Sequence, residues 1–227
     1  MTRHQTRNPR RSPRSAAWRW ARLLAVALVL VVLVRALLVQ SFSVPTGSME
    51  PTIRPGDRLL ANRLVRGDSV HRGDIVVFDG RAAFEDDPAR GAAGVLRSAA
   101  SLLAIDTGTD YVKRVIGLPG DHVVCCDPSG RLVVNDAPVD EPYLQPGDAP
   151  SEVTFDVTVP AGRLWVMGDH RSDSSDSRAY LGRPGGGMVP VDDVIGQATM
   201  RYWPLGRLGS LGGPGALSTV PASGAGH

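Results

Sequence analysis

The chain has 227 residues, of which 42% are hydrophobic and 21% are charged, and its net charge is +2. These values are typical of a globular protein with one substantial domain and some extra segments. The positive charge is gathered at the N-terminus and the remainder is mildly acidic, which argues against nucleic-acid binding.

The first 42 residues predict a membrane anchor. Residues 1–17 form a basic tail: seven arginines fall within the first 22 residues, and no acidic residue precedes Glu50. Residues 18–42 are mostly apolar, and as a helix they would be long enough to cross a bilayer before Pro45 and Gly47 end it. The positive-inside rule then places the N-terminus in the cytoplasm and everything after residue 42 outside the cell membrane.

A cleaved signal peptide is the alternative for the same segment. It would have a basic start, a short apolar run at Leu23–Val34 and a small-x-small cleavage site at Ser41–Ser43. We favour the anchor, with one span and an extracytoplasmic domain over residues 43–210.

The extracytoplasmic part predicts a mainly β fold. Eight short segments are rich in Val, Ile and Leu and are separated by Gly or Pro turns, and Pro128–Gly130 fits a hairpin turn. The predicted strands are Asp57–Val65, Asp74–Phe78, Tyr111–Ile116, His122–Cys126, Arg131–Asn135, Val153–Val159, Arg163–Met167 and Val194–Tyr202.

Two segments do not fit the strand pattern. Residues 79–110 contain an insertion whose centre, Gly91–Ile105, is rich in Ala and Leu and fits a short helix. Residues 211–227 are rich in Gly, Ala, Ser and Pro, which predicts a disordered tail.

The basic residues are 24 arginines and one lysine, Lys113. Arginine cannot lose its proton in a protein, whereas lysine can. Strand alternation places Tyr111, Lys113 and Val115 on one face, where apolar neighbours would desolvate the amine and lower its pKa. Lys113 is therefore a candidate general base, with a salt-bridged surface lysine as the alternative.

Two further segments can carry chemistry. Ser48 lies in Pro45–Thr52, where proline and glycine shape a loop that can present a hydroxyl beside backbone N–H groups, although a plain turn serine is the alternative. Gly168–Arg178 is dense in Ser and Asp, which predicts a loop that hydrogen-bonds its own backbone or a solvated surface loop.

Other kinds of site receive less support. Histidines for a Ser-His-Asp triad exist at His71, His122 and His170, but Gly-x-Ser-x-Gly and His-Glu-x-x-His are both absent. Cys125 and Cys126 are adjacent, a spacing that fits neither a zinc site nor an ordinary disulfide framework. A vicinal disulfide and two free thiols both remain open.

Four segments in order, behind one apolar N-terminal segment, resemble the bacterial type I signal peptidases, the membrane-bound Ser/Lys proteases of peptidase family S26. The resemblance covers the anchor and most of residues 42–206. The segments are the serine box Pro45–Thr52, the strand box Gly73–Phe78, the lysine box Tyr111–Asp121 and the polar loop Gly168–Arg178.

The resemblance implies a role for each of several residues. Ser48 would be the nucleophile and Lys113 its general base. The Ser48 N–H and the Thr46 hydroxyl would form the oxyanion hole. Ser174 would orient the lysine, with Asp176 and Arg178 supporting the loop. Shallow substrate pockets would be lined by Phe42, Val44, Asp110, Tyr111 and Val112.

The same resemblance implies the fold and the substrate. It predicts a coiled β-sheet catalytic domain with a smaller β-rich extension at about residues 120–160, and one transmembrane helix. The substrates would be exported preproteins with small residues at −1 and −3, cleaved without metal or cofactor. His170 and Ser172 depart from the family's pattern, in which Asn and Asp are usual.

Two alternatives remain open. A related Ser/Lys fold serves in self-cleaving repressors of the DNA-damage response, which have a DNA-binding domain and no membrane span. A non-enzymatic anchored β domain is the second alternative, although it would need neither the serine box nor the lysine box.

Overall fold

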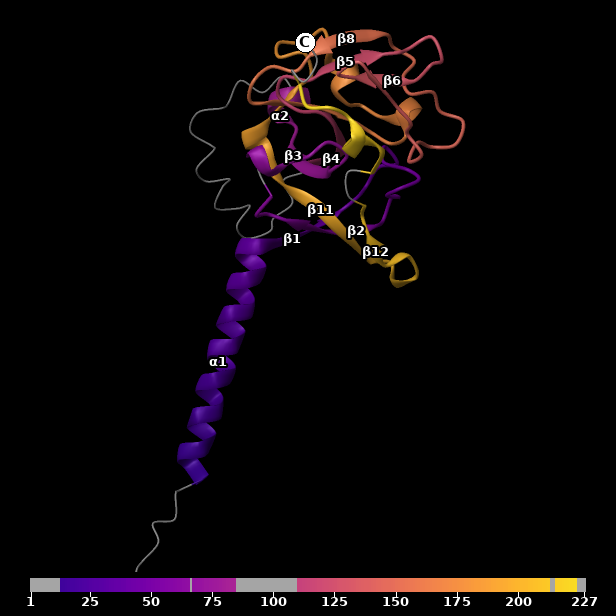
Figure 1. Ribbon diagram of the computed structural model, residues 1–227. Coiled ribbons are helices and arrows are strands. Elements are labelled where there is room, and N and C mark those ends of the chain that lie inside the picture. Colours follow the sequence, from indigo (N-terminus) through magenta and orange to yellow (C-terminus); the bar gives the residue numbers. More distant parts are fainter. Residues whose placement is uncertain (1–12, 66, 85–109, 213–214, 224–227) are drawn as a thin grey trace, which may run out of the picture.

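The computed structural model describes residues 13–65, 67–84, 110–212 and 215–223. Figure 1 shows one long helix, α1, projecting from a body built of β-strands. Every strand pairing in the described residues is antiparallel, and the pairings form two sheets. The prediction of a mainly β fold is therefore confirmed.

Helix α1 runs from Pro13 to Leu38, and its apolar side chains from Leu23 to Val32 are exposed. The predicted helix end at residue 42 is wrong, because Val39–Ser43 forms strand β1 and each of its residues pairs with one of β2 (Arg58–Asn62). Within the described part of the chain, no helix meets the length and apolarity that a bilayer crossing needs. The predicted span is thus not confirmed.

The larger sheet has the strand order β1-β2-β11-β3-β4-β9-β10, with β12 paired to β11. Its strands beyond β1 and β2 are β3 (Ile75–Asp79), β4 (Asp110–Gly117), β9 (Arg163–Met167), β10 (Val189–Pro190), β11 (Val194–Trp203) and β12 (Gly209–Ser210). Strands β3 and β9 are nearly continuous apolar runs, because both faces of the sheet are covered. One cluster includes Ile53, Leu59 and Val77, and another includes Phe78, Val115 and Val166.

The smaller sheet has the order β7-β6-β5-β8 and lies between residues 122 and 158, inside the range expected for a β-rich extension. Its strands are β5 (His122–Cys125), β6 (Leu132–Val134), β7 (Ala137–Val139) and β8 (Phe155–Thr158). The predicted hairpin turn between β5 and β6 is confirmed, since the Gly130 N–H donates to the Asp127 carbonyl at 2.9 Å and Gly130 has a φ of 80°.

Short helices connect the strands. They are α2 (Arg81–Phe84) and the 3₁₀ turns η1 (Gly67–Ser69), η2 (Arg171–Asp173), η3 (Ser177–Tyr180), η4 (Val191–Asp193), η5 (Leu205–Arg207) and η6 (Gly215–Thr219). The helix predicted at Gly91–Ile105 lies outside the described residues, as does most of the 79–110 insertion.

The prediction of a disordered tail over 211–227 is wrong for the part that the structure describes. Leu217 is 1% exposed and, with Val220, belongs to the core cluster that contains Trp165 and the buried residues of the smaller sheet. The Asn135 side chain donates a hydrogen bond to the Pro221 carbonyl at 2.9 Å. Burial of a few apolar side chains is enough to order a segment whose composition otherwise favours disorder.

Candidate active site

Lys113 lies in the middle of β4, the strand between β3 and β9, and is 3% exposed. Its Nζ donates a hydrogen bond to Ser48 Oγ at 2.6 Å. Burial lowers the pKa of Lys113 from 10.5 to about 8; the charge of Asp176 opposes this shift, and that of Arg178 adds to it. The structure therefore joins a buried amine that can be neutral near physiological pH to a serine hydroxyl.

The loop between β1 and β2 carries Ser48. It turns through a hydrogen bond from the Glu50 N–H to the Gly47 carbonyl at 2.9 Å and another from Ile53 N–H to the Met49 carbonyl at 2.8 Å. Met49 and Ile53 are fully buried in the core beneath the loop. These apolar anchors hold the half-buried Ser48 above the sheet, and the exposed Thr46 places its Oγ1 3.5 Å from Ser48 Oγ.

The serine loop meets the polar loop at Gly168, the first residue after β9. A Cβ at Gly168 would lie 2.4 Å from the Ser48 carbonyl oxygen and 2.2 Å from Ser174 Oγ, so any larger residue would push the two loops apart. The His170 N–H also donates to the Ser48 carbonyl at 3.2 Å. Close backbone contact at a glycine therefore fixes Ser48 relative to the polar loop.

Asp176 organises the polar loop from inside. Its carboxylate accepts hydrogen bonds from the Gly168 N–H at 2.9 Å, from Ser174 Oγ at 2.8 Å, and from Arg178 Nε and Nη2 at 2.9 and 2.8 Å. Burial alone would raise the pKa of Asp176, but Arg178 and the other donors outweigh burial and hold it below its usual range. Asp176 and Arg178 thus form a buried ionised pair next to Lys113.

The predicted hydrogen bond from Ser174 to Lys113 stays a prediction. In the structure, the Ser174 hydroxyl donates to Asp176, and Lys113 donates to Ser48. Ser174 is nevertheless part of the contact at Gly168, so all three residues of the polar loop that the sequence singled out lie beside the Ser48–Lys113 pair.

The predicted pocket residues fall into two groups. Phe42 and Val44 are buried in one apolar cluster, and Val112 packs against it. Tyr111 instead stacks on Phe78 with ring centres 6.0 Å apart, in the cluster on the opposite face. Neighbouring residues of β4 point to opposite faces of the sheet, which separates Tyr111 from Val112. The half-buried Asp110 begins β4, opposite Asp79.

The two departures from the family pattern are accommodated by local contacts. His170 places Nδ1 3.3 Å from the Gly47 carbonyl oxygen, beside the serine loop. Ser172 donates to Asp148 through its hydroxyl at 2.8 Å and its N–H at 3.2 Å. A carboxylate thus still supports this part of the loop, but it comes from residue 148.

Sequence reasoning missed a buried network around Asp169. Arg114 binds its carboxylate through Nε at 2.8 Å and Nη2 at 2.6 Å, and Thr52 Oγ1 donates to it at 2.5 Å. The network joins the serine box, the lysine box and the polar loop. Arg114 lies 55 residues from Asp169 in the sequence and Thr52 lies 117 residues from it, so no local spacing pattern could have revealed the pairing.

The two cysteines are joined in the structure as a vicinal disulfide at the end of β5. Cys125 is buried in the core of the smaller sheet, and Cys126 packs against the same core. The disulfide thus belongs to the packing of the extension, and we assign it no chemistry.

The chain is similar to known signal peptidases over most of its length. Residues 17–203 match the family described as "Signal peptidase, peptidase S26". A probable signal peptidase I of Mycobacterium leprae is 35% identical, covering 88% of this chain and 80% of that protein. Signal peptidase I U of Bacillus subtilis is 32% identical, covering 79% of this chain and 83% of that protein.

A crystal structure of a signal peptidase I from Enterococcus faecalis aligns with 57% of this chain and 97% of its own, with 25% identity and a TM-score of 0.38. A signal peptidase I of Mycobacterium tuberculosis (strain H37Rv) is 34% identical over 90% of this chain and 79% of its own length. The family match, together with the relatives from Mycobacterium and Bacillus, shows that the chain belongs to the signal peptidase family, peptidase S26, and is a serine-type peptidase.

Proposed function

We propose that this peptidase removes signal peptides from exported preproteins, with Ser48 as nucleophile and Lys113 as general base. The observation that carries the proposal is the 2.6 Å hydrogen bond between Lys113 Nζ and Ser48 Oγ at a buried amine. With a pKa of about 8, roughly a tenth of the amine is neutral at pH 7 and able to accept a proton.

The reaction proceeds through an acyl-enzyme. Neutral Lys113 Nζ takes the proton of Ser48 Oγ as the oxygen bonds to the scissile carbonyl carbon. The C–N bond then breaks, and the protonated lysine gives its proton to the departing amine. Lys113, neutral again, takes a proton from the water that attacks the ester carbonyl. The ester C–O bond then breaks and Lys113 gives that proton to Ser48 Oγ, which returns both residues to their starting state.

The oxyanion of each tetrahedral intermediate needs donors beside Ser48. The Ser48 N–H and the Thr46 hydroxyl serve this role. The 3.5 Å between Thr46 Oγ1 and Ser48 Oγ supports the assignment, because the Thr46 hydroxyl lies close to the carbon that bonds to Oγ and carries the oxyanion. Ser174, whose hydroxyl donates to Asp176, is the residue that we propose to orient the lysine.

Exported preproteins with small residues at −1 and −3 are the substrates that we propose. Phe42, Val44 and Val112 share one apolar cluster with Met49 and Ile53 of the serine loop, which supports an apolar lining beside the nucleophile. Asp110 and Tyr111 of β4 are the other lining residues that we propose, although Tyr111 packs in the cluster on the opposite face of the sheet from Val112.

Helix α1 is proposed as the single-pass anchor in the cell membrane, with the N-terminus in the cytoplasm and the sheets outside. Its 26 residues span about 39 Å, and the apolar side chains from Leu23 to Val32 are exposed around the helix. Figure 1 shows α1 projecting away from the sheets, as a membrane anchor would. Cleavage after Ser43 would remove β1, an edge strand of the larger sheet, which argues against a cleaved leader.

The test is cleavage of a model preprotein by the full chain in detergent, with Ser48→Ala and Lys113→Ala as variants. Wild type is expected to release the mature protein, with its new N-terminus identified by mass, and both variants are expected to be inactive. Cleavage by Ser48→Ala at more than about a tenth of the wild-type rate would refute the nucleophile.

A further inference from the structure

Arg171 makes contacts on the outer side of the polar loop that the proposed reaction does not use. Its Nε donates to the Gly168 carbonyl at 2.9 Å, and its Nη1 donates to the Pro150 carbonyl at 2.6 Å. Gly168 is the residue against which the Ser48 carbonyl and Ser174 pack. The position of the Arg171 guanidinium therefore sets the position of the glycine behind the nucleophile.

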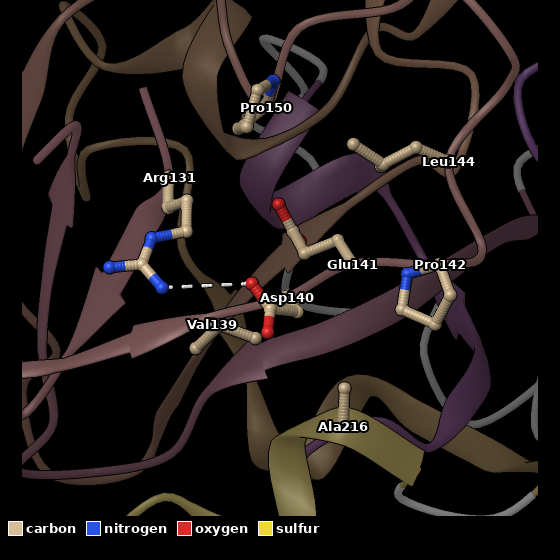
Figure 2. A pocket seen from close by; sticks show the side chains of 8 residues that line it. All are labelled: Arg131, Val139, Asp140, Glu141, Pro142, Leu144, Pro150 and Ala216. Atoms are coloured by element: carbon tan, nitrogen blue, oxygen red, sulfur yellow. Dashed lines mark ion pairs between the residues drawn. The ribbon is translucent and has the colours of Figure 1, made fainter. Parts of the chain in front are cut away.

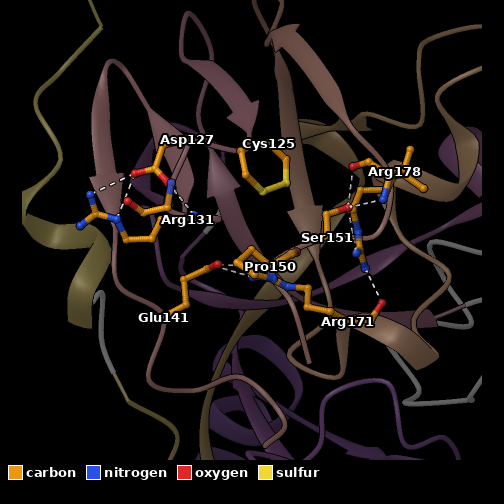
Figure 3. The surroundings of a disulfide bond; sticks show 11 residues. Cys125, Asp127, Arg131, Glu141, Pro150, Ser151, Arg171 and Arg178 are labelled. Atoms are coloured by element: carbon orange, nitrogen blue, oxygen red, sulfur yellow. Dashed lines mark hydrogen bonds and ion pairs between the residues drawn. A yellow bond between two sulfur atoms is a disulfide. The ribbon is translucent and has the colours of Figure 1, made fainter. Parts of the chain in front are cut away.

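Glu141, in the segment that follows β7, holds Arg171 in turn. The two groups form a double hydrogen bond, from Nη1 to Oε2 at 3.0 Å and from Nη2 to Oε1 at 2.5 Å. Both side chains are 2% exposed, and Figure 3 shows Arg171 reaching toward Glu141 and Pro150. A buried two-point pair of this kind fixes the guanidinium in one plane.

Glu141 also reaches the site by a second route. Tyr143 donates its hydroxyl to Glu141 Oε1 at 2.7 Å, and the Arg114 guanidinium lies 4.0 Å from the centre of the Tyr143 ring. Arg114 binds Asp169, which follows Gly168 directly. Contacts that begin at Glu141 thus hold two consecutive residues of the polar loop.

A cavity of about 450 Å³ lies beside this pair, with Glu141, Leu144 and Pro150 in its lining (Figure 2). Loss of the Glu141 carboxylate would let water from the cavity reach Arg171. A hydrated guanidinium binds its protein partners less firmly, so the Gly168 carbonyl would lose its fixed donor.

We propose that Glu141 is a positioning residue for the peptidase reaction: through Arg171 it fixes the Gly168 carbonyl and thereby the geometry of Ser48 and Lys113. The inference rests on the proposed function. Glu141 lies behind the loop, away from the reacting atoms, so its effect falls on kcat. A displacement of about 1 Å in a catalytic pair lowers rates about 100-fold.

The test compares Glu141→Gln with Arg72→Gln, using the full chain in detergent and a short soluble peptide substrate. Glutamine keeps the size of Glu141 but places an N–H₂ group where Arg171 needs an acceptor. Arg72→Gln is the matched control, because it breaks another buried ion pair, with Asp121, whose side chain is 1% exposed. The described contacts of that pair include none to the polar loop.

Glu141→Gln is expected to lower kcat about 10- to 100-fold and to leave KM within about twofold of wild type. The acidic limb of the pH profile should move to higher pH, because water that reaches Lys113 favours its charged form and raises its pKa. Arg72→Gln is expected to lower Tm about as much as Glu141→Gln does. Its kcat should stay within about twofold of wild type, and the acidic limb of its pH profile should not move. If Glu141→Gln does not fold, Glu141→Asp keeps the charge, shortens its reach and provides the same readouts.

Wild-type kcat in a folded Glu141 variant, or an equal loss in Arg72→Gln, would overturn this inference alone, because wild type would still cleave. A wild-type chain that cleaves no peptide would overturn the proposed function as well.

Discussion

Replacing Lys113 by methionine is expected to abolish cleavage and, at the same time, to stabilise the fold near neutral pH. Methionine resembles lysine in length and shape but has no amine to protonate. The two effects have one origin, because the burial that lowers the pKa of Lys113 to about 8 also makes its charged form unfavourable in the folded state.

The size of the stabilisation follows from the pKa shift. A fall from 10.5 to about 8 corresponds to about 3 kcal/mol against the charged amine. The unfolded chain binds more protons between these pH values, so wild-type stability rises with pH from about 8 to about 10.5, and the full cost applies below 8. Loss of the hydrogen bond to Ser48 offsets about 1 kcal/mol. Lys113→Met should then gain about 2 kcal/mol below pH 8.

Lys113→Arg separates charge from basicity at the same position. A guanidinium stays protonated far above pH 8, with fewer than about one in 10⁴ molecules neutral there, so the rate should fall at least about 10⁴-fold, which corresponds to about 5.5 kcal/mol in the activation barrier. Cleavage is measured on a soluble peptide, and stability is measured as Tm at pH 6 and pH 10.

Two results would refute this reasoning. Lysine is excluded as the base if Lys113→Arg retains more than about a tenth of the wild-type rate, which corresponds to a rise in the activation free energy of less than about 1.4 kcal/mol. Lys113→Met with a lower Tm than wild type at pH 6 would mean that burial of the amine does not oppose its charge. A gain of about 2 kcal/mol corresponds to roughly 4–8 °C for a domain of this size, which is well above measurement error.

Four further predictions concern the same site, the anchor and β1. The kcat of wild type should rise with pH through about 8, because the base acts in its neutral form, and a flat profile from pH 5 to 9 would contradict this. Ser174→Ala should lower kcat about 10- to 1000-fold with a Tm near that of wild type, and an unchanged kcat in the folded variant would remove Ser174 from the site. A chain that starts at Val39 should match the full chain on a soluble peptide but cleave preproteins in vesicles more slowly, whereas equal rate ratios on both substrates would mean that α1 does not aid substrate encounter. A chain that starts at Val44 lacks β1 and should also lose thermal stability.

Strand positions could be predicted where alternation or an apolar run is long. Each of the eight predicted segments overlaps a strand. Strand β1 was missed because it directly follows an apolar run that favours a helix, and its strand form depends on pairing with β2. Strands β10 and β12 have two residues each, so they carry no periodicity and exist through their partners β9 and β11.

The supporting charges of the site were less accessible to sequence reasoning than Ser48 and Lys113. Lys113 stood out because it is the one lysine among 24 arginines. Nothing in the sequence distinguishes the buried Arg114 and Arg171 from arginines on the surface. Their carboxylate partners, Asp169 and Glu141, come from other loops and meet them through the fold.

The arginine content has a consequence for catalysis. Burial would lower the pKa values of Arg114 and Arg171, but their carboxylate partners raise them above the usual value, and Arg178 holds the pKa of Asp176 below its usual range. These groups stay ionised across the pH range in which the peptidase works. A lysine in the place of any of these arginines would add a second amine able to lose its proton. Lys113 can therefore titrate against a fixed background of charge, and the pH response of the reaction should report on this one amine.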